Sequence, residues 1–220
     1  MTGTLALVGG AEWSAGCEFD RDLLEASGGR EVLVAATAAA YENPGAAIAR
    51  AEAWFAGFGA TVRALPVYDR AAAGEPANVD VVAAARFVYF ASGSAMHLRS
   101  VLKSSPLWDA IVAAHEQGAV VAAAGSSADV LCDAMVDPRG GGFGVGLGLV
   151  VGLSLIPRFD QWSAEKSRRT IDLAPAGLPL AGIPDRTALV RDAGGWRVAG
   201  VGTVRVFRAG EPADLTALPT

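Results

Sequence analysis

Three short turns rich in glycine and serine carry the residues of this sequence that could perform chemistry. They are Gly9-Gly10-Ala11-Glu12, Ala91-Ser92-Gly93-Ser94 and Gly125-Ser126-Ser127-Ala128, and each follows a short apolar run. A serine on a sharp strand-to-helix turn can act as a nucleophile, because the turn exposes its hydroxyl and the helix N-terminus favours a neighbouring oxyanion. Small residues flank Ser127, so we expect Ser127 to occupy such a turn with strained backbone torsions. The alternative is that this segment is only a helix N-cap.

The apolar runs before these turns belong to a longer alternation of strands and helices. Their residues lack a clean polar–apolar alternation, which is typical of strands covered on both faces. The runs are Thr4–Val8, Glu31–Ala36, Thr61–Pro66, Phe87–Ala91 and Ala119–Ala123. Between them, Asn43 is the expected N-cap of a helix that begins at Pro44, and a second helix is expected to begin at Pro106 and end at Gly118. The sequence therefore predicts an α/β fold with a doubly wound, mainly parallel sheet flanked by helices, and ligands gather at the carboxyl ends of such strands.

The pattern changes near the C-terminus. Short apolar pieces follow Leu178, at Pro179–Ile183, Thr187–Arg191, Trp196–Val198 and Thr203–Phe207. A turn, Ala193-Gly194-Gly195, separates two of these pieces, which favours antiparallel pairing. We predict a short antiparallel C-terminal extension to a single domain that spans residues 1–220, because no linker-like segment interrupts the chain.

Composition excludes several classes of function. The net charge of -5 gives no basic field for a nucleic-acid backbone. Cys17 and Cys132 show no metal-ligand or disulfide-framework spacing, so we predict no metal, no cofactor and a reducing, cytoplasmic location. The 18 uncharged residues between Arg139 and Arg158 approach the length of a membrane span, but seven are glycine. We predict a glycine-rich loop leading into a buried strand there, and no membrane partner.

Taken in order, five segments resemble the peptidase S51 family, which includes dipeptidase E and cyanophycinase and has a class I glutamine amidotransferase-like fold. The first segment, Leu7–Glu12, is similar to the opening strand and glycine turn of that family, and Gly125–Ala128 is similar to its G-x-S-A-G-A elbow. The remaining three are similar to the oxyanion turn and helix, the histidine segment and the I-D-E-x-T-A segment; they are Ser92–Leu102, Gly146–Phe159 and Gly182–Leu189. The resemblance covers nearly the whole chain.

This resemblance implies a role for each matching residue. Ser127 would be the nucleophile, and the backbone N–H groups of Gly93 and Ala128 would bind the oxyanion. Asp185 would remain from the family's acidic pair. The surrounding pocket would contain Glu12, Ser92, Ser126, Asp129 and Arg158.

The chain departs from the family pattern at two positions beside the expected nucleophile. Arg158 stands in the family's P-H-F motif where histidine is expected, and an arginine cannot accept a proton at neutral pH. Asp129 replaces a small glycine of the elbow and would repel an oxyanion. We expect Asp129 and Arg158 to form an ion pair across the cleft. The alternative is that Asp129 faces the helix dipole while Arg158 reaches solvent or a substrate carboxylate.

The two histidines are poor substitutes for the missing base. His97 falls early in the helix after the oxyanion turn, where a helix-surface role is the simpler interpretation, and His115 falls late in a helix that leads away from the turns. Loss of a positioned general base costs about 10²–10⁴ in rate for its own step. The sequence therefore predicts slow hydrolysis at best.

Three functional hypotheses remain open. The leading one is a protein related to peptidase S51 that is impaired or inactive as a peptidase and binds a small molecule or short peptide. The second is an active serine hydrolase on small acidic or β-aspartyl-type peptides, with His97, Asp129 or a water as base. The third is an interaction role through an exposed apolar patch, which would be sought around Trp13, Trp54, Trp108, Trp162 or Trp196. A homodimer is compatible with all three.

Overall fold

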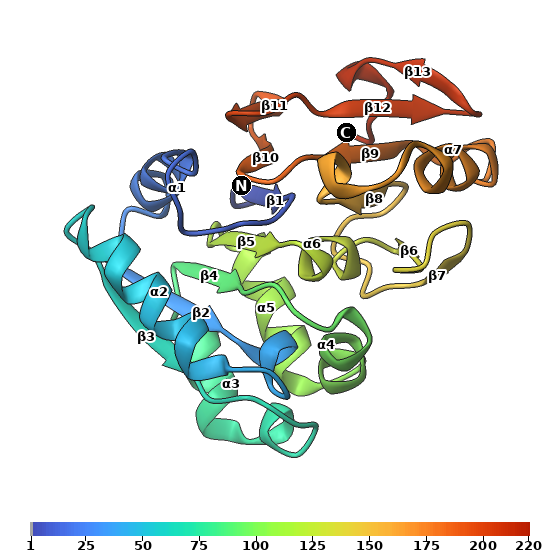
Figure 1. The fold of residues 1–220 in the computed structure, drawn as a ribbon. Coiled ribbons are helices and arrows are strands. Elements are labelled where there is room, and N and C mark those ends of the chain that lie inside the picture. The colour runs from blue at the N-terminus through green and yellow to red at the C-terminus, as the bar shows by residue number, and fades with distance from the viewer. Residues whose placement is uncertain (1) are drawn as a thin grey trace.

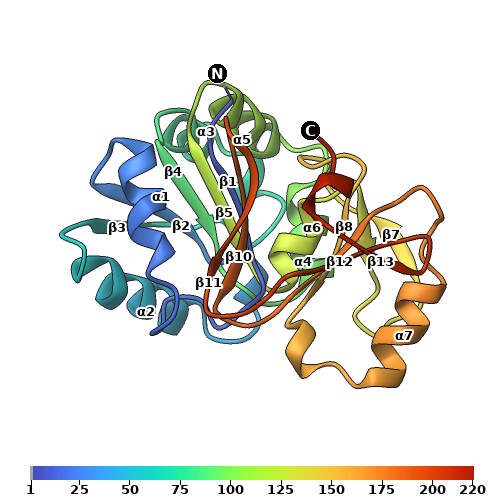
Figure 2. The same cartoon turned by 90° about the horizontal axis from the view of Figure 1, so that it is seen from above.

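The computed structural model, which describes residues 2–220, contains a seven-stranded sheet with the order β11-β10-β1-β5-β4-β2-β3 (Figures 1 and 2). The five strands from β1 to β3 in this order pair in parallel, and β10 and β11 add an antiparallel edge. The strands are β1 Leu5–Val8, β2 Glu31–Ala35, β3 Thr61–Leu65, β4 Phe87–Phe90, β5 Val120–Ala124, β10 Thr187–Asp192 and β11 Gly195–Gly200. The predicted α/β fold with a mainly parallel sheet is confirmed.

Both faces of this sheet are covered by helices, which explains why its central strands are apolar throughout. Along β1, Leu5 and Leu7 pack into a cluster with α3, α4, α5 and α6, while Ala6 and Val8 pack into a second cluster with α1 and α2. The helices are α1 Phe19–Ser27, α2 Pro44–Ala56, α3 Pro76–Ala83, α4 Ala95–Leu102, α5 Pro106–Glu116, α6 Ser126–Val130 and α7 Ala164–Asp172. β1, β4 and β5 lie inside the sheet, so their carboxyl ends bring the three glycine–serine turns together.

The helix signals in the sequence correspond to real caps. The Asn43 side chain accepts a hydrogen bond from the Ala46 N–H at the start of α2, and Pro106 opens α5. Short 3₁₀ turns complete the connections; they are η1 Thr37–Ala39, η2 Ala72–Gly74, η3 Phe159–Gln161 and η4 Leu215–Ala217.

The C-terminal region is more complex than the predicted antiparallel extension. A four-stranded sheet has the order β13-β12-β9-β8, and β6 and β7 form a separate hairpin. Their bounds are β6 Ala134–Val136, β7 Phe143–Val145, β8 Ser154–Pro157, β9 Leu180–Ile183, β12 Arg205–Arg208 and β13 Glu211–Ala213. β9 pairs in parallel with β8, while β10 and β11 join the main sheet. The strands predicted after Leu178 pair antiparallel as expected, β9 with β12 and β10 with β11. The parallel strand β8, which precedes Leu178, is an addition that the prediction did not include.

Two further expectations concern apolar segments. The run between Arg139 and Arg158 consists of a hairpin strand, a loop and the buried strand β8, and no helix within residues 2–220 is long and apolar enough to cross a membrane. Trp13 and Trp108 are buried, and within the described chain no tryptophan is among the exposed large apolar side chains. The tryptophans therefore form no exposed apolar patch.

Candidate functional site

A cavity of about 480 Å³ lies at the carboxyl ends of β4, β5 and β8; we call it the elbow cleft. Its polar lining consists mainly of Ser92, Gly93, Ser126, Asp129, Arg158 and Lys166. The cleft therefore brings together five of the residues predicted from sequence. Glu12, Ser127, Ala128 and Asp185 do not line it.

The strained elbow conformation occurs at Gly125, two residues before the predicted position. Gly125 connects β5 to α6 with φ 56° and ψ -133°, a combination that residues with a Cβ rarely adopt. In a nucleophile elbow, this junction between strand and helix is where the nucleophile stands. If the junction is aligned with the S-A-G-A part of the family motif, Gly125 takes the serine position and Ala128 the final alanine. On that alignment, the family's nucleophile position falls on Gly125.

Ser127 is a structural residue and does not reach the cleft. It lies within α6, its side chain is fully buried, and its hydroxyl donates a 2.7 Å hydrogen bond to the Ala91 carbonyl at the end of β4. The N–H of Ala128 is also occupied, since it donates to the Gly125 carbonyl at 3.0 Å. The predictions of a strained backbone at Ser127 and of a free oxyanion donor at Ala128 are wrong, because the elbow begins two residues earlier.

Ser92 fills the space that a side chain at the elbow would need. A Cβ built on Gly125 would overlap the Ser92 Oγ and lie 3.0 Å from the Ser92 Cβ. The resemblance to the peptidase S51 family implies that Ser92 stands at a glycine position of the oxyanion turn. In this chain Ser92 and Gly125 lie against each other, so the hydroxyl is on the β4 turn and the glycine on the β5 turn.

The oxyanion turn is held firmly from three sides. The buried Glu12 carboxylate accepts a 3.0 Å hydrogen bond from the Ser92 N–H. The Ser126 hydroxyl donates to the Gly93 carbonyl, and the Ser94 N–H donates to the Ala38 carbonyl at 2.8 Å. Glu12 therefore acts on the cleft by positioning this turn.

Arg158 occupies the histidine position and pairs with Asp185. Its Nε lies 3.2 Å from Asp185 Oδ1, and its backbone N–H donates to the Gly9 carbonyl at 2.9 Å. A Cβ at Gly10, whose φ is 152°, would collide with both side chains, so the first glycine turn allows the pair to form. The two positions to which the resemblance assigns the histidine and the acidic residue are thus in contact, as an ion pair.

Asp129 does not pair with Arg158, which corrects the predicted ion pair across the cleft. Its carboxylate is 3% exposed and accepts hydrogen bonds from the N–H groups of Val136 at 2.9 Å and Leu155 at 3.3 Å. Burial raises the pKa of Asp129 well above its usual value, and the two N–H donors oppose that rise. Asp129 therefore joins α6 to β6 and β8, and Arg158 pairs instead with Asp185, which does not line the cleft.

Sequence reasoning missed Lys166 and Trp162, which close the cleft from the side of α7. The Lys166 ammonium lies 3.6 Å from the centroid of the Trp162 ring and donates to the Pro138 carbonyl at 2.7 Å. Burial, followed by the nearby Arg169, lowers the pKa of Lys166. Neither residue belongs to a recognisable motif, and Trp162 precedes α7, so no helical spacing predicted their contact.

The two histidines are remote from this chemistry. His97 Nε2 lies 2.9 Å from the Tyr68 carbonyl, and its ring packs edge-on against Tyr41. His115 is buried in α5, with Nδ1 3.1 Å from the Ala119 carbonyl. Neither lines the elbow cleft.

Comparison with solved structures identifies the fold. A peptidase from an acI-B1 Actinobacterium has a TM-score of 0.86 and 27% sequence identity, over 97% of this chain and 93% of that one. A putative peptidase E protein from Listeria monocytogenes EGD-e has a TM-score of 0.68 and 13% identity, over 92% of this chain and 100% of that one. No protein-family model and no curated protein matches the sequence. The chain thus has the peptidase S51-like fold that the order of its motifs predicted.

Proposed function

We propose that this peptidase S51-like protein is inactive as a serine peptidase and uses the elbow cleft to bind a small molecule or short peptide. The observation that carries the proposal is the glycine at the elbow. A serine peptidase needs a hydroxyl on that residue, aimed at the scissile carbonyl. Gly125 has no side chain, and the Ser127 hydroxyl is fully buried.

The residue at the base position supports the same conclusion. A general base must accept the nucleophile's proton, and a guanidinium stays protonated at any physiological pH. The Arg158 guanidinium is moreover engaged in an ion pair with Asp185. In triads, loss of the nucleophile or the base alone removes almost the entire joint rate gain, on the order of 10⁶. This chain lacks both.

The cleft itself is retained, which favours binding as its use. Its volume of about 480 Å³ lies within the range of small-molecule sites. Within residues 2–220, Arg158 is paired through its Nε only, so its terminal nitrogens remain available for a ligand. Lys166 adds further donors at the wall, because its ammonium has three N–H groups and the Pro138 carbonyl takes one of them. These donors suit a ligand with several acceptor oxygens.

A fluorophosphonate probe tests this proposal, because it labels only activated serines. We expect no labelling of the wild-type protein and no turnover of Asp-X or β-Asp-Arg dipeptides, with an active serine hydrolase as positive control. Arg158→His alone should restore neither. Combining Ser92→Gly, Gly125→Ser and Arg158→His rebuilds the oxyanion glycine, the nucleophile and a base beside Asp185. Labelling at residue 125 in that triple variant, and in no single variant, is the expected result.

One observation favours a second candidate, hydrolysis from Ser92. Its Oγ occupies the space next to Gly125 where a nucleophile side chain would stand. No histidine lines the cleft to accept its proton. Probe labelling of the wild-type protein that disappears in Ser92→Ala, but persists in Ser126→Ala, would establish this activity and overturn the first proposal.

We also propose a reducing compartment, the cytoplasm, as the site of action. Cys17 and Cys132 are both free thiols, and both are buried. Burial raises the pKa of Cys17 to about 11, which keeps this thiol protonated and unreactive.

A further inference from the structure

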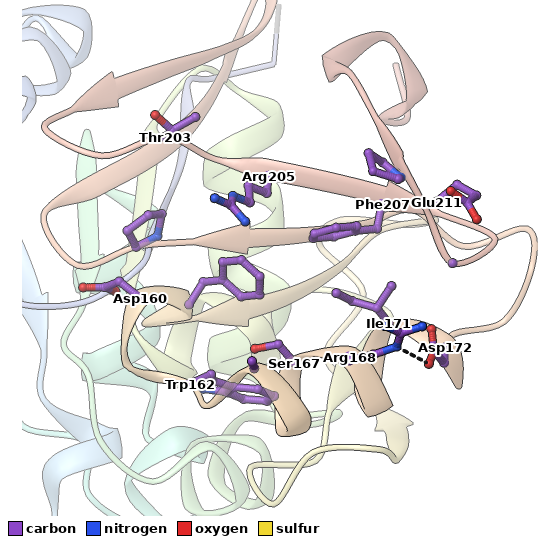
Figure 3. A pocket seen from close by; sticks show the side chains of 15 residues that line it. Asp160, Trp162, Ser167, Arg168, Ile171, Asp172, Thr203, Arg205, Phe207 and Glu211 are labelled. Carbon is purple, nitrogen blue, oxygen red and sulfur yellow. Dashed lines mark ion pairs between the residues drawn. The ribbon is translucent and has the colours of Figure 1, made fainter.

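A second, larger cavity lies outside the elbow cleft, between α7 and the sheet formed by β12, β13 and β9 (Figure 3). Its volume is about 810 Å³; we call it the α7 groove. Trp162 lines both cavities and therefore forms part of the wall between them. None of the motifs found in the sequence accounts for this groove.

The floor of the groove is aromatic and recessed. The Phe159 and Phe207 rings lie 6.0 Å apart at 55°, and both are half-buried, as is Trp162. The large apolar side chains that protrude from the surface in residues 2–220 all lie elsewhere. A protein partner would need apolar groups that protrude, whereas a recessed aromatic floor accepts a small planar group that enters from solvent.

The charges around the groove leave one cation without a partner. Arg168 is paired with Asp172 at 3.6 Å, and the Asp160 carboxylate accepts hydrogen bonds from the Asp185 N–H and the Gln161 amide. Arg205 is exposed, and its guanidinium forms no hydrogen bond or ion pair with any residue between 2 and 220. Figure 3 shows Phe207 between Arg205 and Glu211, so the Glu211 carboxylate lies on the far side of Phe207 from Arg205.

We propose that the α7 groove binds a planar aromatic carboxylate. Its ring would pack on Phe159 and Phe207, and its carboxylate would take both terminal nitrogens of Arg205. The groove volume accommodates a bicyclic ring system. This site is separate from the elbow cleft and does not depend on whether the cleft performs hydrolysis.

A pair of matched probes tests both parts of the site. 2-Naphthoate and neutral 2-naphthalenemethanol share the same ring and differ in charge. Binding is measured by calorimetry and by quenching of Trp162 fluorescence, with Trp162→Phe identifying that signal. We expect the wild-type protein to bind the carboxylate about tenfold or more tightly than the alcohol, since charge-assisted hydrogen bonds contribute this much.

Arg205→Gln should remove that preference while leaving the alcohol's affinity unchanged. The matched control is Arg208→Gln, on the same strand but outside the groove, which should retain the preference. Phe207→Leu should weaken both probes together. Thermal unfolding of each variant establishes that it is folded.

Three results would overturn the proposal. The first is that neither probe binds. The second is that Arg205→Gln keeps the full preference for the carboxylate; if Arg158→Gln then removes it, the probe lies in the elbow cleft. The third is a dimer in sedimentation that Phe207→Leu dissociates, which would identify a second copy of the chain as the occupant. Fluorophosphonate labelling is independent of all three readouts, so this proposal and the proposed function can fail separately.

Discussion

The close contact between Gly125 at the elbow and Ser92 leads to a quantitative prediction about stability. Gly125→Ser places a Cβ in a backbone conformation that costs roughly 1–3 kcal/mol for residues other than glycine. The same Cβ overlaps the Ser92 Oγ, and overpacking of this kind adds about 1–3 kcal/mol. We therefore expect Gly125→Ser to lower the free energy of unfolding by roughly 2–6 kcal/mol.

The second step removes the obstacle. Ser92→Gly deletes the side chain that the new Cβ meets, so the double variant should lose only the backbone part of the cost. The two substitutions should thus be coupled by about 1–3 kcal/mol in a double-mutant cycle. Urea unfolding of the wild-type protein, both single variants and the double variant measures this coupling directly.

A glycine elsewhere provides the matched control. Gly148 also has a positive φ, of 76°, but a Cβ there meets nothing within 4 Å. Gly148→Ser should therefore show a backbone cost alone, and its effect should simply add to that of Ser92→Gly. Simple additivity between Gly125→Ser and Ser92→Gly would refute the claim that Ser92 fills the place of the elbow side chain.

Three further predictions concern residues away from the elbow. Ser127→Ala should lower the free energy of unfolding by about 1–3 kcal/mol without affecting ligand binding, since it leaves the buried Ala91 carbonyl without its donor; calorimetry and urea unfolding together check this. Asn43→Ala should cost about 0.5–2 kcal/mol through loss of the α2 cap, and unchanged stability would contradict that role. Burial lowers the pKa of His115, so the folded state resists its protonation, and stability should fall as the pH drops below the unfolded value of 6.5. His115→Gln should flatten this part of the pH profile, and an identical slope in both proteins would show that another group is responsible.

The fold could be predicted because its signals are local and redundant. Each central strand is a short apolar run that the structure places within one residue of the predicted bounds, and Asn43 and Pro106 mark helix starts by their own chemistry. The pairing of β9 with β8 had no such signal. It depends on the path of the glycine-rich loop, which places β8 beside β9. A short apolar strand does not itself specify which strand it pairs with.

The prediction of a strained elbow at Ser127 was wrong for a reason that lies in the backbone. Pattern matching located a G-x-S sequence at residues 125–127, but an elbow is defined by torsion angles at the end of the strand. β5 is apolar through Ala124, so the first residue able to turn is Gly125. The end of the apolar run therefore located the elbow correctly at Gly125, whereas the match to the G-x-S motif located it at Ser127.

The unusual residues around the cleft are better understood in pairs than one at a time. Glycine at position 125 would leave a void, and Ser92 fills it; arginine at position 158 would bring a lone charge, and Asp185 neutralises it. Asp129 is a third unusual residue, and its carboxylate is satisfied by two backbone N–H groups of neighbouring strands. Each unusual residue is thus matched by neighbouring groups that supply packing, charge balance or hydrogen bonds. Selection for a stable cleft without peptidase chemistry would produce this pairing, whereas decay of an unused active site would leave voids and unpaired charges behind.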